Sequence, residues 1–334
     1  MATALVIGGT GQIGRAVVPA LLGDGWDVRV LARHAAEVDG AAVVVGDRSD
    51  PEALDRALGR SVDVLVDVVA FDDRQAEPLL ARADRMGSAV VVSSAAVYVD
   101  DAGNGFETDE FAHFPVPVDE DQPTVAPGRE TYATGKVALE QAWASSPVPT
   151  TILRPGAIHG AGCRQPREWL FVKRALDGRD VRVLAYDGES RFHTTATAVL
   201  GELVRLAAGR PGDRALNAAD PRALTVAEIS AAIDAAMGVS PAYVMLPGAP
   251  AGDLGSTPWT VPHPVVLGMT RARAELGYVA PGRYEDTVRS CVEWLVDAAS
   301  RSDWREAFPG FARMDPGDTF FDYAAEDAFL ARRS

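Results

Sequence analysis

A tyrosine and a lysine four residues apart form the first group in this sequence whose types and spacing suggest chemistry. Tyr132 and Lys136 lie in the segment TYATGK, which is predicted to be helical. This spacing brings two side chains onto one face of a helix, about 6 Å apart along its axis. An ammonium nearby favours the phenolate, and lowering the tyrosine pKa from about 10 by about 3 units would give an acid/base at neutral pH. Such pairs also occur by chance in helices without a catalytic role.

A serine at the end of a predicted strand adds to this pair. Ser94 closes the apolar run of residues 89–94. Ligands of open α/β sheets bind outside the carboxyl ends of the strands, so a hydroxyl there can bond a substrate carbonyl or alcohol oxygen. The sequence therefore predicts Ser94, Tyr132 and Lys136 as the catalytic residues.

A glycine-rich turn, the segment GGTGQIG at residues 8–14, suggests a bound cofactor. It follows an apolar run directly and precedes a segment of helical composition. Glycines permit a tight turn and close backbone approach, while the free N–H groups that begin the helix bind a pyrophosphate. In a βαβ context the pattern predicts a dinucleotide-binding turn, although a tight turn without a ligand can have the same sequence.

The end of the second predicted strand indicates which dinucleotide is bound. An NAD-binding fold usually has an acidic residue there, which bonds the ribose 2′-hydroxyl. This chain has Arg33, which could hold a 2′-phosphate with Arg15 as a second donor, so the sequence favours NADP over NAD. The alternative is an exposed arginine without a ligand. Asp47, which closes the third strand, is placed either to meet the adenine amino group or to cap the next helix.

The hydrophobic pattern predicts the scaffold for these groups. Short β-branched runs alternate with helical segments, which is typical of βαβ units around a parallel sheet. A predicted N-cap, Asp50, precedes Pro51. The strands are expected at residues 4–8, 28–32, 42–46, 62–69 and 89–94, with a sixth ending near residue 154, and the helices at residues 12–22, 51–58, 129–143, 167–176, 196–208, 225–237 and 284–298.

The predicted fold class is α/β, a doubly wound parallel Rossmann sheet with a smaller mixed α/β substrate lobe at the C-terminus. Residues 1–158 are expected to form the dinucleotide-binding domain and residues 159–334 the substrate-binding lobe, with interleaving of the two allowed. Residues 100–130, rich in acidic residues, proline and glycine, are predicted to be a lid or binding loop, or else a solvated surface excursion.

Composition disfavours several classes of protein. With 32 Lys plus Arg and 47 Asp plus Glu among 334 residues, the net charge is −15, which argues against nucleic-acid and membrane-surface partners. The N-terminus lacks a signal-peptide pattern, no apolar run approaches the roughly 20 residues of a membrane span, and two cysteines are too few for a disulfide scaffold or metal cluster. We therefore expect a cytoplasmic protein without a metal that acts on a small molecule; a homodimer is compatible with the sequence.

The motifs together resemble the extended short-chain dehydrogenases/reductases, the family often labelled NAD-dependent epimerase/dehydratase. The resemblance covers most of the chain and is specific for fold and cofactor more than for substrate. It rests on the glycine motif, the segment VSSAAVY at residues 92–98, the acidic-proline segment at residues 120–123, Tyr132 with Lys136, residues 153–155, and residues 269–278 with Trp294.

This resemblance implies a role for each matching residue. Tyr132 would be the general acid/base, Lys136 would bind the nicotinamide ribose and lower the pKa of the tyrosine, and Ser94 would position the substrate oxygen. The cofactor would supply the hydride chemistry. The cofactor contacts implied are Gly8, Gly11, Gln12, Ile13, Gly14, Arg33, Asp47, Arg48, Ala70, Tyr132, Lys136 and Pro155.

Departures from the family pattern narrow the chemistry. In its sugar-nucleotide dehydratases an Asp-Glu pair follows the serine or threonine and drives elimination of water, whereas this chain has Ala95 and Ala96, so 4,6-dehydration is not expected. Ala157 stands where sugar-nucleotide members tend to have asparagine, but Arg191 occupies the place of an arginine that binds nucleotide phosphates. Thr197 stands where that arginine motif is usually followed by an aspartate, so a nucleotide sugar is an alternative with weak support.

Several further residues have a structural and a functional interpretation. His159 and His193 could donate to a substrate, but a histidine near a strand end more often has a structural role. Trp169 and Phe171 could line a pocket, but their spacing is more typical of a core. Cys163 is expected to pack inertly in a glycine-rich turn, like most isolated cysteines.

The sequence thus predicts an NAD(P)-dependent oxidoreductase that moves a hydride at a secondary alcohol or ketone of a small polar substrate. It could act as a reductase or as an epimerase that regenerates its own cofactor. A nucleotide-sugar epimerase is one alternative, and a cofactor-binding regulator without turnover is another, since fold does not imply function. The intact set of Ser94, Tyr132 and Lys136 favours an enzyme.

Overall fold

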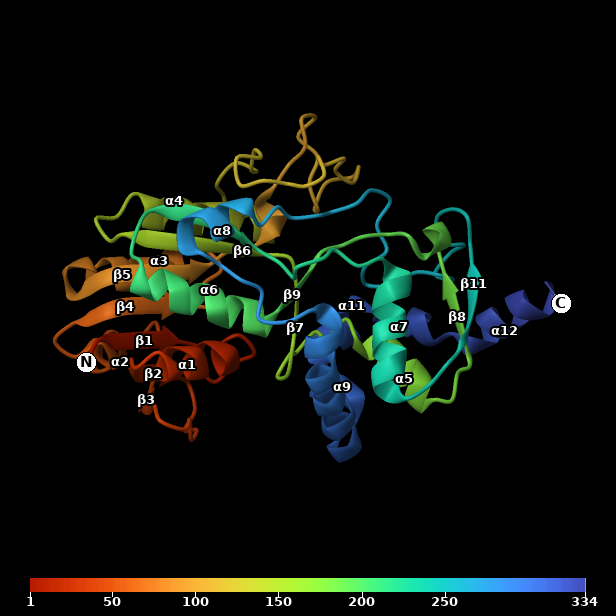
Figure 1. Ribbon diagram of the computed structural model, residues 1–334, viewed down its shortest axis with the longest axis horizontal. Helices are drawn as coiled ribbons and strands as arrows, with labels where there is room; N and C mark the ends of the chain where they lie inside the picture. The colour runs from red at the N-terminus through yellow and green to blue at the C-terminus, as the bar shows by residue number, and fades with distance from the viewer. Residues whose placement is uncertain (334) are drawn as a thin grey trace.

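A seven-stranded parallel sheet forms the centre of the first half of the molecule, in a computed structural model that describes residues 1–333 (Figure 1). The strand order is β10-β6-β5-β4-β1-β2-β3, so the chain reverses its direction across the sheet between β1 and β4. Such a reversal opens a crevice at the carboxyl ends of the strands. The strands are β1 (Thr3–Ile7), β2 (Asp27–Ala32), β3 (Ala42–Val45), β4 (Val62–Asp67), β5 (Met86–Val92), β6 (Thr150–Pro155) and β10 (Arg214–Ala218).

Helices cover both faces of this sheet, because its strands are apolar on both sides. Successive residues of a strand point to opposite faces. Ala4 and Val6 of β1 therefore pack with α1 (Gly14–Gly23), α6 (Thr197–Gly209) and α8 (Thr270–Leu276). Leu5 and Ile7 pack on the other side with α2 (Pro51–Leu58), α3 (Asp73–Leu80) and α4 (Tyr132–Ala144).

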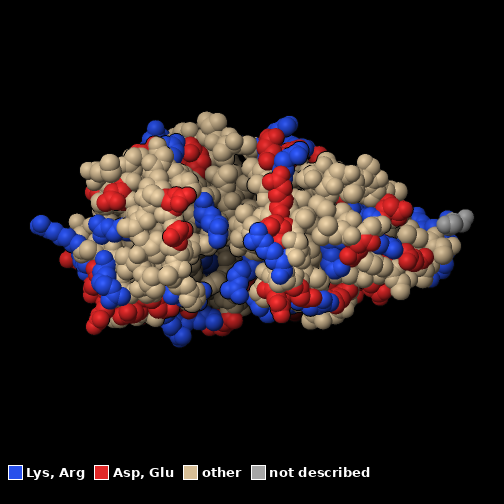
Figure 2. All heavy atoms as spheres, turned by 90° about the horizontal axis from the view of Figure 1, so that it is seen from below, with Lys and Arg blue, Asp and Glu red and all other residues tan. Residues whose placement is uncertain are grey.

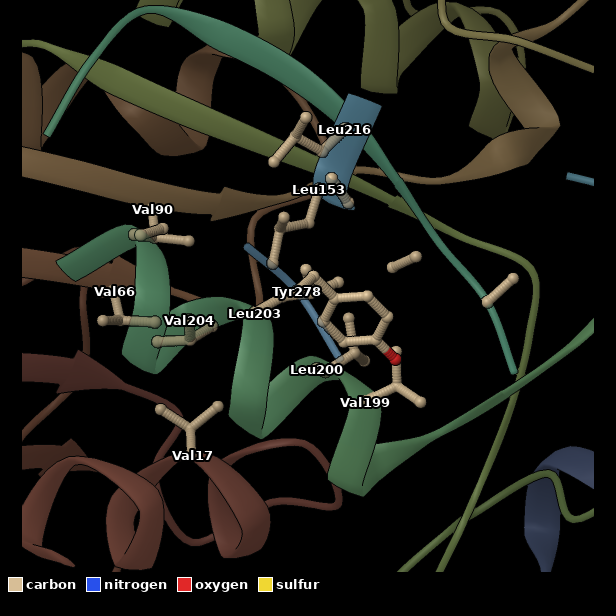
Figure 3. Packing of buried hydrophobic residues seen from close by; sticks show 14 of the residues in the cluster. Val17, Val66, Val90, Leu153, Val199, Leu200, Leu203, Val204, Leu216 and Tyr278 are labelled. Atoms are coloured by element: carbon tan, nitrogen blue, oxygen red, sulfur yellow. The ribbon is translucent and has the colours of Figure 1, made fainter. Parts of the chain in front are cut away.

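The core beneath α6 illustrates this packing (Figure 3). Leu200, Leu203 and Val204 project from α6 toward the sheet, where Val66 and Leu153 lie. All five side chains are fully buried, and each contributes about 1.5–3 kcal/mol relative to an exposed position. The sheet is thus a rigid platform for the loops at its carboxyl edge.

The second half of the chain forms a smaller body beside that edge (Figure 1). Its core is built from α5 (Trp169–Leu176), α7 (Val226–Met237), α9 (Tyr284–Arg301) and α11 (Pro309–Met314). The remaining elements are two short parallel pairs, β7 (Ala157–His159) with β9 (Thr194–Ala196) and β8 (Val181–Leu184) with β11 (Ala242–Met245), and the helices α10 (Trp304–Ala307) and α12 (Tyr323–Ala331). The predicted fold class is confirmed. Lys and Arg side chains flank the hollow between the two bodies in the view of Figure 2.

Most predicted elements are present, with shifted ends. Helix α4 begins at Tyr132 rather than near residue 129, because the Thr131 hydroxyl accepts the Thr134 N–H and caps the helix there. Helix α3 was not predicted; it contains Pro78 and begins after Asp72, which accepts the Gln75 N–H. The division at residue 158 stays a proposal, and β10 and α6 from beyond it lie in the layers of the central sheet.

Residues 1–333 contain neither a candidate membrane span nor a candidate metal cluster. None of their helices has both the length and the apolar content to cross a bilayer. Nor do these residues contain three His, Cys, Asp or Glu side chains gathered as metal ligands.

Candidate active site

The glycine turn between β1 and α1 has the geometry of a phosphate cradle. The Gly11 N–H donates to the Gly8 carbonyl at 2.9 Å, and Gly8 has a φ of +88°. A Cβ on Gly14 would lie 2.4 Å from the Gly8 oxygen, and one on Gly9 would lie 2.7 Å from Val30. Helix α1 has no side-chain cap at Ile13. The Arg15 and Ala16 N–H groups donate to the Gly11 and Ile13 carbonyls, whereas the structure of residues 1–333 gives no partner to the Gln12, Ile13 and Gly14 N–H groups, which are left for an anion. The turn therefore fits the pyrophosphate of a dinucleotide.

A cavity of about 720 Å³ extends from this turn along the carboxyl ends of β1, β2 and β3. Arg33, Arg74 and Arg164 line it, and the structure gives none of the three an ion-pair partner within residues 1–333. Gly8, Gly11, Asp47 and Arg48 of the predicted cofactor contacts also lie on its wall.

One carboxylate oxygen of Asp47 accepts hydrogen bonds from the protein, and the other has no hydrogen-bond partner among residues 1–333. Its Oδ1 accepts both the N–H and the hydroxyl of Ser49, at 2.8 and 2.6 Å. These hydrogen bonds, with smaller effects of Arg33 and Arg48, lower the pKa of the Asp47 carboxyl. Helix α2 is capped by Asp50, which accepts the Glu52 N–H at 3.0 Å. Of the two interpretations of Asp47, the cap is excluded, and the adenine contact stays a prediction.

Two predicted cofactor residues, Arg48 and Ala70, have partners within the protein. Arg48 forms a two-pronged ion pair with Asp67 at 2.8 and 2.7 Å, which ties the loop after β3 to the end of β4. The Ala70 carbonyl accepts a hydrogen bond from Lys136. Arg15 lines a different hollow, with His159 and Ser290, and not the cavity of Arg33, so its help to Arg33 stays a prediction that the structure does not support. Arg74 and Arg164 share the cavity of Arg33 instead.

Ser94, Tyr132 and Lys136 converge at the carboxyl edge of the sheet. Tyr132 is the first residue of α4 and lies with Ser94 on the wall of a cavity, from which a substrate can reach it. The Ser94 Oγ accepts the Ala96 N–H at 3.1 Å, which leaves its own O–H free to donate. Lys136 is buried, and its Nζ lies 5.6 Å from the centre of the Tyr132 ring.

The ammonium of Lys136 bonds the backbone rather than the phenol. Its Nζ donates to the Ala70 carbonyl at 2.6 Å, in the loop after β4, and to the Val92 carbonyl at 3.0 Å, at the end of β5. Two of its three N–H donors are thereby used, and one remains. Burial lowers the pKa of Lys136 to about 8, against the opposing charges of Asp67 and Glu140.

The expectation of a lowered tyrosine pKa is wrong for this structure. Burial raises the pKa of Tyr132 above its ordinary value, and the Glu107 carboxylate raises it further. The Ser94 hydroxyl and the Arg167 guanidinium act in the opposite direction but do not reverse the shift. Tyr132 is therefore protonated at neutral pH and is suited to donate a proton.

A second cavity, of about 580 Å³, opens in front of Ser94 and Tyr132. Phe71 lies on the wall of both cavities, so the two adjoin there. The segment of residues 100–130 supplies Phe106 and Glu107, which supports its interpretation as a binding loop. The other wall residues are Gln12, Ser93, Ala95, Ala96, Pro155, Gly156, Ile158, Cys163, Gln165, Arg167, Phe192, His193 and Val265.

The alternative site residues are mostly structural. His159 bonds Asp220 at 3.0 Å, while His193 bonds the Asp220 carbonyl and accepts the Leu267 N–H. Arg191 donates to the Ala223 carbonyl at 2.6 Å and is not on the wall of the second cavity, which weakens the predicted phosphate role.

Three apolar or thiol side chains that could have been functional are also buried. Trp169 packs on Phe308, and Phe171 stacks on Trp259. Burial raises the pKa of the Cys163 thiol to about 12, so it is a poor nucleophile.

Sequence reasoning missed several residues of this region. Asp67 ends β4 and is fully buried, and a charged residue at the end of an apolar run was the available signal. Glu107 bonds the Ala133 N–H at 2.9 Å and so holds the start of α4. Nothing in the local sequence of Arg74, Arg164 or Arg167 shows that the fold directs them to the two cavities.

Comparison with known proteins places residues 8–168 in the NAD(P)H-binding family. No curated protein sequence matches the chain. Among solved structures, UDP-N-acetylglucosamine 4-epimerase from Bacillus cereus is 17% identical with a TM-score of 0.65, over 88% of this chain and 96% of that one.

Two further solved structures contain NAD. The enzyme WbmH of Bordetella bronchiseptica, in complex with NAD+, is 19% identical with a TM-score of 0.69, over 89% of this chain and 99% of that one. The dTDP-glucose 4,6-dehydratase of Bacillus anthracis, in complex with NAD, is 17% identical with a TM-score of 0.66, over 92% and 100%. At these identities the likeness shows a shared fold, which is the fold that the resemblance seen in the sequence implies. The match to residues 8–168 supports an NAD(P)H-binding domain there.

Proposed function

Because this chain has the fold of the extended short-chain dehydrogenases/reductases, with an NAD(P)H-binding domain at residues 8–168, we propose that it is an NADP(H)-dependent oxidoreductase. Its substrate is a small compound with a secondary alcohol or ketone. The observation that carries the proposal is the meeting of Ser94, Tyr132 and Lys136 beside a cavity that adjoins the nucleotide cavity at Phe71.

The proposed chemistry assigns one proton to Tyr132. In the direction of reduction, its hydroxyl donates a proton to the carbonyl oxygen of the substrate, and Ser94 donates a hydrogen bond to the same oxygen. The raised pKa of Tyr132 suits this direction, since it keeps the proton in place until reaction. The bound nicotinamide supplies the hydride. The remaining N–H of Lys136 is available for a hydroxyl of the nicotinamide ribose.

The preference for NADP rests on charge in the nucleotide cavity. An NAD site offers a carboxylate to the ribose 2′-hydroxyl, whereas this chain places the unpaired Arg33 at the end of β2. Arg74 and Arg164 on the same wall add positive charge that suits a 2′-phosphate.

A direct assay tests the proposal. Purified protein is incubated with NADPH and a panel of ketones, and absorbance at 340 nm is followed. Stoichiometric loss of absorbance supports a reductase, because an epimerase would regenerate its cofactor within each turnover. Tyr132→Phe should lower turnover by at least two orders of magnitude while NADPH still binds. Unchanged turnover would remove Tyr132 from the mechanism.

A nucleotide-sugar epimerase is the second candidate, favoured by the likeness to the Bacillus cereus epimerase. Ala157 and the outward contacts of Arg191 argue against it. Inversion of a UDP-sugar without net consumption of NADPH would favour this candidate over the reductase. A regulator without turnover would bind NADPH and fail both assays.

A further inference from the structure

Arg167 is an arginine without a counter-ion on the wall of the substrate cavity. Residues 1–333 place no carboxylate within ion-pair distance of it, and its Nε is shielded from solvent without a hydrogen-bond partner. Its guanidinium lies 5.7 Å from the centre of the Phe192 ring. An unpaired charge withdrawn from water is costly, so this position is one that an anion would stabilise.

The buried arginines among residues 1–333 are neutralised, whereas Arg167 is partly buried. Arg154 is paired with Glu140, Arg182 with Asp234, and Arg174 with Glu326. Arg167, in contrast, has no ion-pair partner among residues 1–333. The chain therefore leaves an open positive charge in the substrate cavity.

Nearby acidic groups do not supply the missing partner. Glu107 lines the same cavity, but one of its oxygens accepts the Ala133 N–H. Glu168 follows Arg167 directly in the chain and is buried among His159 and Tyr284. Burial raises the pKa of the Glu168 carboxyl, which makes it a weak counter-charge.

The rest of the cavity wall is suited to the body of an organic anion. Phe106, Ile158, Phe192 and Val265 line it with apolar surface. Apolar walls reduce the local dielectric constant and strengthen the attraction between Arg167 and an anion. Ser94 and Tyr132 lie on the same wall, where the reacting oxygen would be held.

We infer that Arg167 binds an anionic group of the substrate, so that the substrate is a hydroxy or keto compound carrying a carboxylate or a phosphate. The position of the reacting oxygen rests on the proposed function, whereas the anion site rests on Arg167 and the cavity alone. An arginine fork binds either anion through two parallel hydrogen bonds.

A binding experiment tests the anion site without turnover. Tyr132→Phe enzyme saturated with NADPH is titrated calorimetrically with phenylpyruvate, its methyl ester, phenyl phosphate and UDP. At least one of the three anions should bind 10- to 100-fold more tightly than the neutral ester. The tightest anion then distinguishes a carboxylate, a simple phosphate and a nucleotide diphosphate.

Variants at Arg167 show whether this residue causes the preference for anions over the neutral ester. In the same Tyr132→Phe background, Arg167→Met should abolish the preference for anions, Arg167→Lys should keep part of it, and Arg289→Met, an exposed control on α9 with the same loss of charge, should leave it unchanged. Binding of all three anions no tighter than the ester, no anion binding at millimolar concentration, or a preference that survives Arg167→Met would each overturn the inference.

The outcome is separable from that of the proposed function. If anions bind through Arg167 but no carbonyl compound consumes NADPH, the proposed function fails and the anion site stands. If ketones are reduced equally well with and without a charged group, the proposed function stands and the anion site fails. Thermal unfolding of Arg167→Met checks its fold; Arg167→Gln replaces it if it is unstable.

Discussion

The Lys136 ammonium lies 5.6 Å from the centre of the Tyr132 ring, but it is bonded to the carbonyl of Val92, which ends β5, and to that of Ala70 in the loop after β4. Lys136 therefore links two segments at the carboxyl edge of the sheet by hydrogen bonds, and it also lies beside the phenol of Tyr132. Because it is buried, its protonation is coupled to the stability of the fold.

The free energy of unfolding should therefore rise at alkaline pH. The pKa of Lys136 falls from 10.5 to about 8 on folding. Below pH 8 both states carry the proton, and the folded state bears the full cost of the buried charge, about 3 kcal/mol. Between pH 8 and 10.5 the unfolded state binds more protons, so stability increases with pH.

Denaturant unfolding of wild type and Lys136→Met at pH 7, 8.5 and 10 measures this contribution. The free energy of unfolding of the wild type should increase relative to that of Lys136→Met as pH rises. The lost hydrogen bonds to Ala70 and Val92 are the same at each pH, so they do not contribute to the trend. A constant difference would show that Lys136 has an ordinary pKa in the folded protein.

The pH dependence of ketone reduction should follow the same group. Tyr132 has a raised pKa and stays protonated through neutral pH, so it does not limit the rate there. Lys136 loses its charge near pH 8 and with it part of its hold on the cofactor ribose. We expect kcat/KM for NADPH to be flat below pH 7 and to fall above about pH 8, which reports the free enzyme. In Lys136→Arg the fall should move to higher pH.

The cofactor preference should reverse when the charge at the end of β2 is reversed. Arg33→Asp should weaken NADPH binding by about 10- to 100-fold, since a charge-assisted hydrogen bond to the 2′-phosphate is lost, and should weaken NADH much less. Arg74→Met should change binding in the same direction by a smaller factor, because Arg74 lines the same cavity. Fluorescence titration with both cofactors measures these ratios. Equal effects on NADPH and NADH would contradict the assignment of a 2′-phosphate site.

The sequence predicted those parts of the molecule whose residues are close together in the chain. Strand β1, the glycine turn and the start of α1 are contiguous, so their pattern and spacing specify the cradle. Lys136 and Tyr132 were predicted correctly to share a helix, since their spacing is four residues.

Charges brought together from distant segments could not be predicted this way. The pKa of Tyr132 depends on burial and on Glu107, 25 residues earlier in a segment without periodicity. Arg33 lines the cavity beside the glycine turn, as its place after β2 predicts, but its neighbours there, Arg74 and Arg164, are set by helix α3 and by the approach of the second body. The pKa of Tyr132 and the positions of Arg74 and Arg164 depend on how distant segments pack together, and the hydrophobic pattern of the sequence does not specify this packing.

The ion pair of Arg48 and Asp67 gives the last prediction, because it links stability to the site. Asp67 is fully buried and accepts from Arg48, Val69 and Ala70. Asp67→Asn should lower the free energy of unfolding by about 3 kcal/mol, since it leaves a partly buried arginine without its partner.

The same variant should also alter the pH profile. The Asp67 charge raises the pKa of Lys136, so its removal should move the fall of kcat/KM below pH 8. Asp55→Asn is the matched control, because Asp55 is half exposed and also paired with arginines, Arg82 and Arg85. It should change neither stability nor the pH profile appreciably. A loss of stability in Asp67→Asn without a shifted pH profile would show that Asp67 supports the fold of this edge but does not influence Lys136.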